Sequence, residues 1–270
     1  MPLPPVWVPP HQTSPPAHGL LSVADVLPES GSHWQIAGVE YDCPARVGEV
    51  VVGSVACPDD PDFGDGDEGF DPRTDVPVRL STVLAAKPVG RTLDDFRVLA
   101  REQLRAGEGP ALEQVLWSTH DTDPRFMHED MPTPTGLVAV GVLDAVGALD
   151  AWLYNHYAGT GMIHVPRKIV GHLVKAKAVR HDGGRLVTQL GTPVVAGAYP
   201  GTGPEDQTPD AGQVWIAATG DVRVRRTEVL QATDGDFDPA TNTVTTIAQR
   251  IYVASWDGLS AAALVDVKEL

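Results

Sequence analysis

The spacing of apolar residues changes repeatedly between residues 136 and 204, and each change falls close to a glycine or a proline. In residues 136–157 the large apolar side chains recur at steps of three and four, as on the buried side of a helix. The glycines of the "AGTG" sequence that follows are typical of a helix end. Residues 136–157 therefore predict a helix with one or more buried faces.

A strand–helix–strand unit is predicted to follow this helix. Residues 162–165 predict a short strand, and Pro166 is expected to open a new helix, where its missing N–H costs nothing. Glycines 183 and 184 then turn the chain into a strand over residues 185–197. The "GTG" sequences at 159–161 and 201–203 lack the Gly-Lys-Ser/Thr ending of a phosphate-binding loop, so we interpret them as turns.

The N-terminal half is predicted to be more extended. A proline-rich arm comes first, and the valine-rich alternation of residues 33–57 predicts two or three strands. Residues 58–75 carry eight carboxylates and one arginine, which predicts an exposed loop. After a strand at 76–86, Thr92 begins a sequence that resembles a capping box, and the helix it opens is expected to end at Gly107. Residues 110–117 predict a further turn or two of helix.

The C-terminal part predicts mainly strands. Residues 214–219 and 221–229 predict a hairpin around Gly220 and Asp221. Residues 242–270 alternate well and predict one long strand or a strand pair. With helices and strands mixed in this order, and no internal repeat, the predicted fold class is α+β.

Residue types that carry enzyme chemistry do not form a recognisable pattern. No serine lies in a G-x-S-x-G or S-x-x-K sequence. His156, His164 and His172 fall on different predicted elements, so we expect structural or surface roles for them. Cys43 and Cys57 are expected to be free thiols, with a single disulfide as the alternative. We therefore predict no enzymatic activity, no catalytic residue and no cofactor.

Acidic residues dominate the chain: 36 Asp and Glu stand against 20 Lys and Arg, for a net charge of −16. Such a surface repels DNA and argues against a general nucleic-acid coat. Asp234, Asp236 and Asp238 match the first three ligand positions of a calcium loop, but proline and threonine replace its glycine and glutamate. We therefore expect no metal site. No segment approaches the roughly 18 apolar residues needed to cross a bilayer.

Taken in order, the C-terminal elements resemble the major capsid proteins of tailed bacteriophages, whose Hong Kong 97-like fold is shared with encapsulins. The resemblance is carried by the "MIHVP" step at residues 162–166 and by the "GTPVV" strand at 191–195. The apolar and arginine-rich strands of residues 214–229 and the closing strands continue the same order. The C-terminal half of the chain carries this resemblance, and the N-terminal half matches more loosely.

The resemblance implies a structural protein that assembles with copies of itself into pentamers, hexamers or both, in the icosahedral shell of a virion built in the host cytoplasm. Further capsid or decoration proteins are possible partners, and packaged DNA lies nearby without being specifically recognised. No membrane is implied. The implied segments are an N-terminal arm (1–35), an extended strand pair with an acidic loop (36–90), a peripheral-domain helix and connection (91–135), an axial-type domain (136–240) and closing strands that return to the peripheral domain (241–270).

One contact between subunits follows from this picture as a hypothesis. The arginine-rich strand offers cations, and the acidic loop of a neighbouring subunit offers carboxylates. The residues concerned are Arg223, Arg225 and Arg226 on the strand, and Asp65, Asp67 and Glu68 in the loop.

Three other interpretations stay open at this point. An encapsulin-like compartment shell would use the same fold, and a decoration, neck or tail protein would share the acidic, strand-rich composition. A soluble enzyme of unrecognised type is the third alternative. It would require a concave site with perturbed titrating groups.

Overall fold

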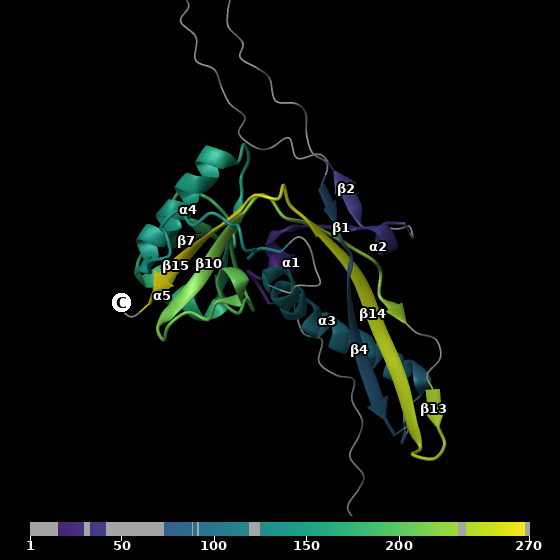
Figure 1. Ribbon diagram of the computed structural model, residues 1–270. Coiled ribbons are helices and arrows are strands. Elements are labelled where there is room, and N and C mark those ends of the chain that lie inside the picture. Colours follow the sequence, from purple (N-terminus) through teal and green to yellow (C-terminus); the bar gives the residue numbers. More distant parts are fainter. Residues whose placement is uncertain are drawn as a thin grey trace, which may run out of the picture.

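The computed structural model describes residues 16–29, 33–41, 73–87, 89–90, 92–118, 125–231 and 236–267. These residues form two large sheets and two two-stranded ones, and the large sheets are joined by a long helix and by crossing segments (Figure 1). Residues 1–15, both cysteines and residues 58–72 of the predicted acidic loop lie outside the described residues, so the predictions made for them stay predictions. For the last three residues of that loop the prediction is wrong, because Arg73–Asp75 form a strand and Asp75 is fully buried. In the part of the chain that is described, no helix is both long and apolar enough to span a membrane.

The six-stranded sheet is organised around its longest strand, β14. One edge of β14 pairs antiparallel with β4 over nine residues, and its other edge pairs with three shorter strands. Alternate residues of β14 are buried from Val244 to Tyr252, as expected for a strand that packs one face on a helix. The strands are β1 (Asp25–Pro28), β4 (Val78–Ala86), β11 (Arg223–Arg226), β12 (Leu230–Gln231), β13 (Asp236–Asp238) and β14 (Thr243–Ser255).

The long helix α3 (Leu93–Ser118) runs alongside β4 and β14 (Figure 1). Its predicted cap is confirmed: the Thr92 N–H donates to Asp95 Oδ2 at 2.7 Å, and the Asp95 N–H donates to Thr92 Oγ1 at 3.3 Å. The predicted end at Gly107 is wrong, because the helix continues through Gly107 and Pro110. Both halves have buried apolar contacts that outweigh the propensity costs of about 1 kcal/mol for Gly and about 3 kcal/mol for Pro. The buried side chains are Phe96, Ala100 and Leu104 before Gly107, and Leu112, Leu116 and Trp117 after it.

The five-stranded sheet has helices on both faces. One face packs against α4, α5 and the β7–β8 hairpin, and the other against α1 and the second half of α3. The strand order is β5 (Val140–Gly141), β15 (Ser260–Asp266), β10 (Gln213–Thr219), β6 (Met162–Pro166) and β9 (Val194–Gly197). The covering elements are α1 (Leu20–Val23), α4 (Val142–His156), α5 (Val170–Lys175), β7 (Val179–Asp182) and β8 (Arg185–Thr188).

The strand–helix–strand unit and the helix before it are confirmed, with three local differences. The predicted helix at 136–157 begins only at Val142, after the short strand β5. Pro166 does not open a helix. It ends β6, where it pairs with Gly197, and the 3-10 turn Arg167–Ile169 precedes α5. The predicted strand at 185–197 is two strands, β8 and β9, separated by a turn. Because β6 and β9 pair in parallel, everything between them is one crossover connection.

The hairpin predicted around Gly220 and Asp221 is wrong. β10 lies in the five-stranded sheet and β11 in the six-stranded sheet, so residues 220–222 cross between the two. The closing segment crosses back in the same place, because β14 and β15 also belong to different sheets. A hydrogen bond joins the two segments that cross between the sheets: the Gly220 N–H donates to the Leu259 carbonyl at 3.1 Å. The local sequence is typical of a hairpin, because a glycine turn has the same sequence whether its flanking strands pair with each other or with other strands.

Three further elements flank the undescribed residues 42–72: helix α2 (Trp34–Ala37), strand β2 (Val39–Tyr41) and strand β3 (Arg73–Asp75). The strand predicted at the start of residues 33–57 is wrong, because Trp34–Ala37 are helical. A 3-10 turn at Pro204–Asp206 lies between β9 and β10. β2 and β3 pair antiparallel, and the Tyr41 hydroxyl donates to Asp75 Oδ2 at 2.8 Å. Tyr41 and Arg73, which lie directly before and after residues 42–72, are therefore held side by side.

Candidate functional site

The three arginines of β11 each lie beside a carboxylate of the same chain. Arg223 Nε is 3.6 Å from Asp221, Arg225 Nε is 3.5 Å from Glu29, and Arg226 Nη1 is 3.5 Å from Glu108. All three side chains keep some exposure to solvent, from 24% to 60%. Their hypothesised carboxylate partners Asp65, Asp67 and Glu68 lie outside the described residues, so pairing between subunits stays a prediction.

Glu108 is the centre of a buried charge cluster that joins α3 to β14. The Arg250 Nη1 donates to both of its carboxylate oxygens, at 2.9 and 2.6 Å, and the Tyr252 hydroxyl donates to Oε2 at 2.5 Å. Burial, and then the neighbouring Glu108, raise the pKa of the Tyr252 hydroxyl, so it stays protonated as a donor. The cluster fixes the position of the helix on the sheet at the turn between Gly107 and Pro110.

Glu113 joins α3 to two other segments. Its Oε1 accepts the Leu20 N–H of α1 at 2.7 Å, and its Oε2 accepts the Ala198 N–H after β9 at 2.6 Å. A side chain at Gly197 would place its Cβ 2.7 Å from the Glu113 carboxylate carbon, so glycine is required there. Burial raises the pKa of Glu113, although the two N–H donors and Arg167 oppose that shift.

His164 of β6 is completely buried. Its Nδ1 is 3.0 Å from the Tyr199 hydroxyl, its Nε2 is 2.8 Å from Thr219 Oγ1, and its ring stacks on Phe126 at 4.2 Å. Since Thr219 donates its own proton to the Gly220 carbonyl, we assign the ring proton to Nε2 and the acceptor role to Nδ1. Burial lowers the pKa of His164 to about 3, so the imidazole is neutral.

Two further glycines of residues 156–203 are closely packed against neighbouring atoms. A Cβ on Gly161 would lie 2.5 Å from the Thr219 carbonyl oxygen, and one on Gly203 would lie 2.3 Å from the Trp215 indole nitrogen. His156 is exposed at the end of α4, and His172 lies on α5. The three histidines therefore share no face. Within the described residues, no group of three or more His, Cys, Asp or Glu side chains is arranged to hold a metal ion.

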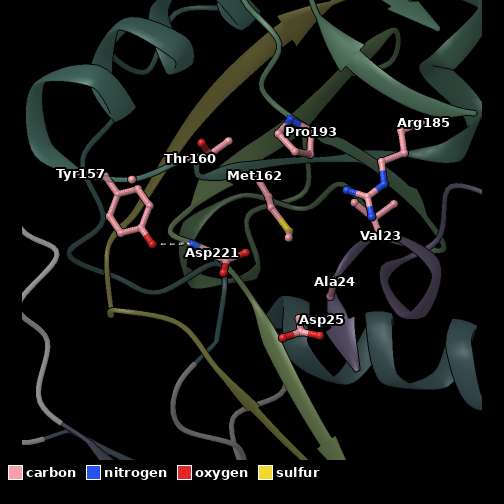
Figure 2. A pocket seen from close by; sticks show the side chains of 10 residues that line it. Val23, Ala24, Asp25, Tyr157, Thr160, Met162, Arg185, Pro193 and Asp221 are labelled. Carbon is pink, nitrogen blue, oxygen red and sulfur yellow. Dashed lines mark hydrogen bonds between the residues drawn. The ribbon is translucent and has the colours of Figure 1, made fainter. Parts of the chain in front are cut away.

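A pocket of about 560 Å³ opens where α1 and β1 meet the five-stranded sheet (Figure 2). Its walls combine apolar side chains with Asp25, Asp221 and Arg185, and Arg185 lies on the opposite side from Tyr157. Burial raises the pKa of Asp221, with Arg223 opposing and Asp25 adding to the shift. The described lining residues include no Ser, Cys, His or Lys. The Tyr157 hydroxyl accepts the Asp221 N–H at 3.1 Å, which makes this wall part of the crossing between the sheets.

No protein-family model and no curated protein matches this sequence. Solved structures do match. The capsid of an empty GTA particle computed with C5 symmetry aligns with 97% of this chain and 94% of its own, at a TM-score of 0.57 and 15% identity. The capsid of Ralstonia phage GP4 aligns with 98% of this chain and 95% of its own, at a TM-score of 0.56 and 10% identity. This chain has the Hong Kong 97-like fold.

The Hong Kong 97-like fold is also the one that the sequence resemblance implied, and the structural match extends it from the C-terminal half to nearly the whole chain. The holo-SrpI encapsulin complex from Synechococcus elongatus PCC 7942 aligns at a TM-score of 0.55 and 12% identity, over 98% of this chain and 94% of its own. The two capsids and the encapsulin thus match this chain about equally well.

Glu108 and Glu113, which hold α3 in place, were not identified from the sequence. One signal for Glu108 was present: it falls at the four-residue step between Leu104 and Leu112, inside an otherwise apolar stripe. A carboxylate at such a position must have a buried partner. The assumed helix end at Gly107 hid this spacing. No comparable signal marked Glu113, because its partners are backbone N–H groups of residues far away in the sequence.

Proposed function

We propose that this chain is the major capsid protein of a tailed bacteriophage, a structural protein that self-assembles into pentamers, hexamers or both in an icosahedral head shell. The observation that carries the proposal is the match to capsid subunits over nearly the full length of both chains. The protein then belongs to the virion, has no enzymatic activity and needs no cofactor. Its partners are copies of itself, with other capsid or decoration proteins as neighbours.

In this proposal, each of the two large sheets corresponds to one domain of a capsid subunit. The six-stranded sheet with α3 corresponds to a peripheral domain, and the five-stranded sheet with α4 and α5 to an axial domain. Within the predicted arm of residues 1–35, α1 and β1 instead pack with the two sheets, so the arm is proposed for the residues before them. Within residues 36–90, β2 and β3 form the base of the proposed extended loop, and β4 belongs to the six-stranded sheet. The predicted limits at 91–135, 136–240 and 241–270 change in two places in this proposal. β15 pairs with β10, so residues 260–266 go with the axial domain, and β11, β12 and β13 lie in the six-stranded sheet, so they go with the peripheral domain.

The charge and shape of the chain support a shell subunit. Extended segments that cannot fold alone gain contact area by lying across neighbouring subunits. A net charge of −16 keeps packaged DNA from being trapped on the shell. Pairing of the β11 arginines with the acidic loop of a neighbour is part of the same proposal.

An encapsulin-like compartment shell is the second candidate, favoured by the similar match to the SrpI encapsulin. Size-exclusion chromatography and negative-stain microscopy of the purified chain test both shell functions, because either predicts large hollow particles. A chain that stays monomeric at micromolar concentration contradicts both. Antibody labelling of purified virions then separates the alternatives: labelled heads support a capsid protein, labelled necks or tails another virion component, and unlabelled virions a compartment shell.

A further inference from the structure

The pocket where α1 and β1 meet the five-stranded sheet has no role in the proposed function (Figure 2). Its volume of about 560 Å³ lies within the range of about 300–1,000 Å³ that is typical of small-molecule sites. Its lining residues come from segments far apart in the sequence: the end of α1 with β1, the chain between α4 and β6, β8, and the crossing between the sheets. A molecule bound there therefore contacts elements of both large sheets.

One side of the pocket carries an excess of negative charge. Asp25 of β1 and Asp221 of the crossing both line it, and we name these two carboxylates the acidic end. Burial, and then the nearby carboxylates of Asp25 and Asp257, raise the pKa of Asp221, against the effect of Arg223. The Arg223 side chain is 60% exposed and its Nε is 3.6 Å from Asp221, so it neutralises the group only in part. In the part of the chain that the structure describes, Asp25 has no ion-pair partner.

A positive charge lies on another side of the same pocket. Arg185 of β8 is exposed, and no carboxylate of the described residues forms an ion pair with it. We name its guanidinium the basic end. Figure 2 shows the Met162 side chain between the basic end and the acidic end, and Val23 adds a further apolar side chain to the lining. The pocket thus has opposite charges on two sides of an apolar wall.

We propose that this pocket binds a small amphoteric molecule, with an ammonium or guanidinium group at one end of an aliphatic chain and a carboxylate at the other. The cationic group lies against the acidic end, and the carboxylate accepts hydrogen bonds from Arg185, whose guanidinium can bind a carboxylate through two N–H groups. The aliphatic chain covers Met162. A molecule with cations at both ends is repelled by Arg185, and an anion is repelled by the acidic end, so the pocket discriminates against both.

Binding should also stabilise the chain. Asp25 belongs to the six-stranded sheet through β1, whereas Arg185 belongs to the hairpin that covers the five-stranded sheet. A molecule that bridges these two residues holds the two sheets together, and a ligand that binds only the folded state raises Tm with its concentration. The whole site lies within one copy of the chain, so it does not depend on the proposed shell function.

Three molecules with the same aliphatic chain test the proposal on the purified wild-type protein: ε-aminocaproate, hexylamine and hexanoate. We expect ε-aminocaproate to bind with a Kd of about 1 mM or below. Hexylamine and hexanoate each lose one charged contact and should bind about tenfold more weakly or worse. Isothermal titration calorimetry measures the binding, and the shift of Tm in differential scanning fluorimetry checks that it stabilises the fold.

Two variants assign the contacts. Arg185→Gln should remove the preference for ε-aminocaproate over hexylamine, and Asp25→Asn should weaken the binding of both molecules by about tenfold. The matched controls are Arg79→Gln and Glu129→Gln, which make the same charge changes at exposed positions outside the lining and should bind as the wild type does. Circular dichroism checks the fold of each variant. If a variant does not fold, the comparison of the three molecules on the wild type still decides.

Failure of ε-aminocaproate to bind at about 10 mM overturns the proposal, as does equal binding of all three molecules. Hexylamine that binds as tightly as ε-aminocaproate also overturns it, since Arg185 then takes no part. A preference that persists in Arg185→Gln, or that is lost equally in the control variants, has the same consequence. Binding by a chain that never assembles supports this site while it contradicts the shell function, and a shell that assembles without binding the molecule contradicts this site alone.

Discussion

Protonation of His164 should make the stability of the chain depend on pH. The imidazole is neutral in the folded protein, where its pKa is lowered from 6.5 to about 3 by burial. In the unfolded chain the imidazole takes up a proton once the pH falls below 6.5. The contribution of His164 is thus fully present above pH 6.5 and is lost as the pH falls toward 3, because only the unfolded state binds the proton over that interval.

The size of the effect follows from the difference between these two pKa values. Each pH unit between 6.5 and 3 lowers the free energy of unfolding by about 1.4 kcal/mol. Between pH 7.0 and pH 5.5 the loss from His164 alone is about 1.3 kcal/mol. Glu113 acts in the opposite direction, since its raised pKa favours proton uptake by the folded chain at low pH. Only a comparison between variants therefore isolates the contribution of His164.

The assay is urea unfolding at pH 7.0 and pH 5.5, followed by tryptophan fluorescence, for the wild type and His164→Gln. The variant should lose about 1.3 kcal/mol less than the wild type over this interval, whatever its absolute stability. His181→Gln removes an exposed histidine and is the matched control, which should behave like the wild type. Equal losses in the wild type and His164→Gln would refute the assignment of a neutral, buried imidazole.

Three further predictions concern the helix α3 and the packing of glycines. Glu108→Leu leaves the Arg250 guanidinium buried without its carboxylate and should cost about 3–5 kcal/mol in urea unfolding, with a loss below about 1 kcal/mol arguing against the buried pair. Glu113→Ala removes the acceptor of two backbone N–H groups, at about 1–3 kcal/mol each, and should accelerate their hydrogen exchange; unchanged exchange would contradict the contact. Gly107→Ala should raise the free energy of unfolding by about 0.5–1 kcal/mol, because open space surrounds this mid-helix position, whereas Gly161→Ala should lower it by about 1–3 kcal/mol; the opposite order of Tm values would be inconsistent with the packing.

Features set by neighbouring residues could be predicted from the sequence. The cap at Thr92 depends on a side chain three residues away, and the strand at 162–165 is recognisable from its own apolar run. The order of such elements was sufficient to indicate the Hong Kong 97-like fold. Physical chemistry within a few residues of the chain determines these features, so no tertiary information was needed.

Features set by distant partners could not be predicted. The continuation of α3 through Gly107 and Pro110 depends on contacts with β14, about 140 residues further along. The turn at Gly220 was assigned to a hairpin because nothing local shows that its two strands pair with β15 and β14 instead. The partners of Glu113 are backbone N–H groups that any residue could provide. The sites that hold the sheets together are thus the least visible in the sequence.

The central claim is that this chain builds a closed shell from rings of its own copies. Electron microscopy of the purified chain, with symmetric averaging of the assembled particles, tests it most directly. The proposed function predicts hollow icosahedral particles in which the five-stranded sheet, α4 and α5 lie around five-fold or six-fold axes. A chain that remains monomeric, or that forms rings with α3 and β14 at the axis, would contradict it.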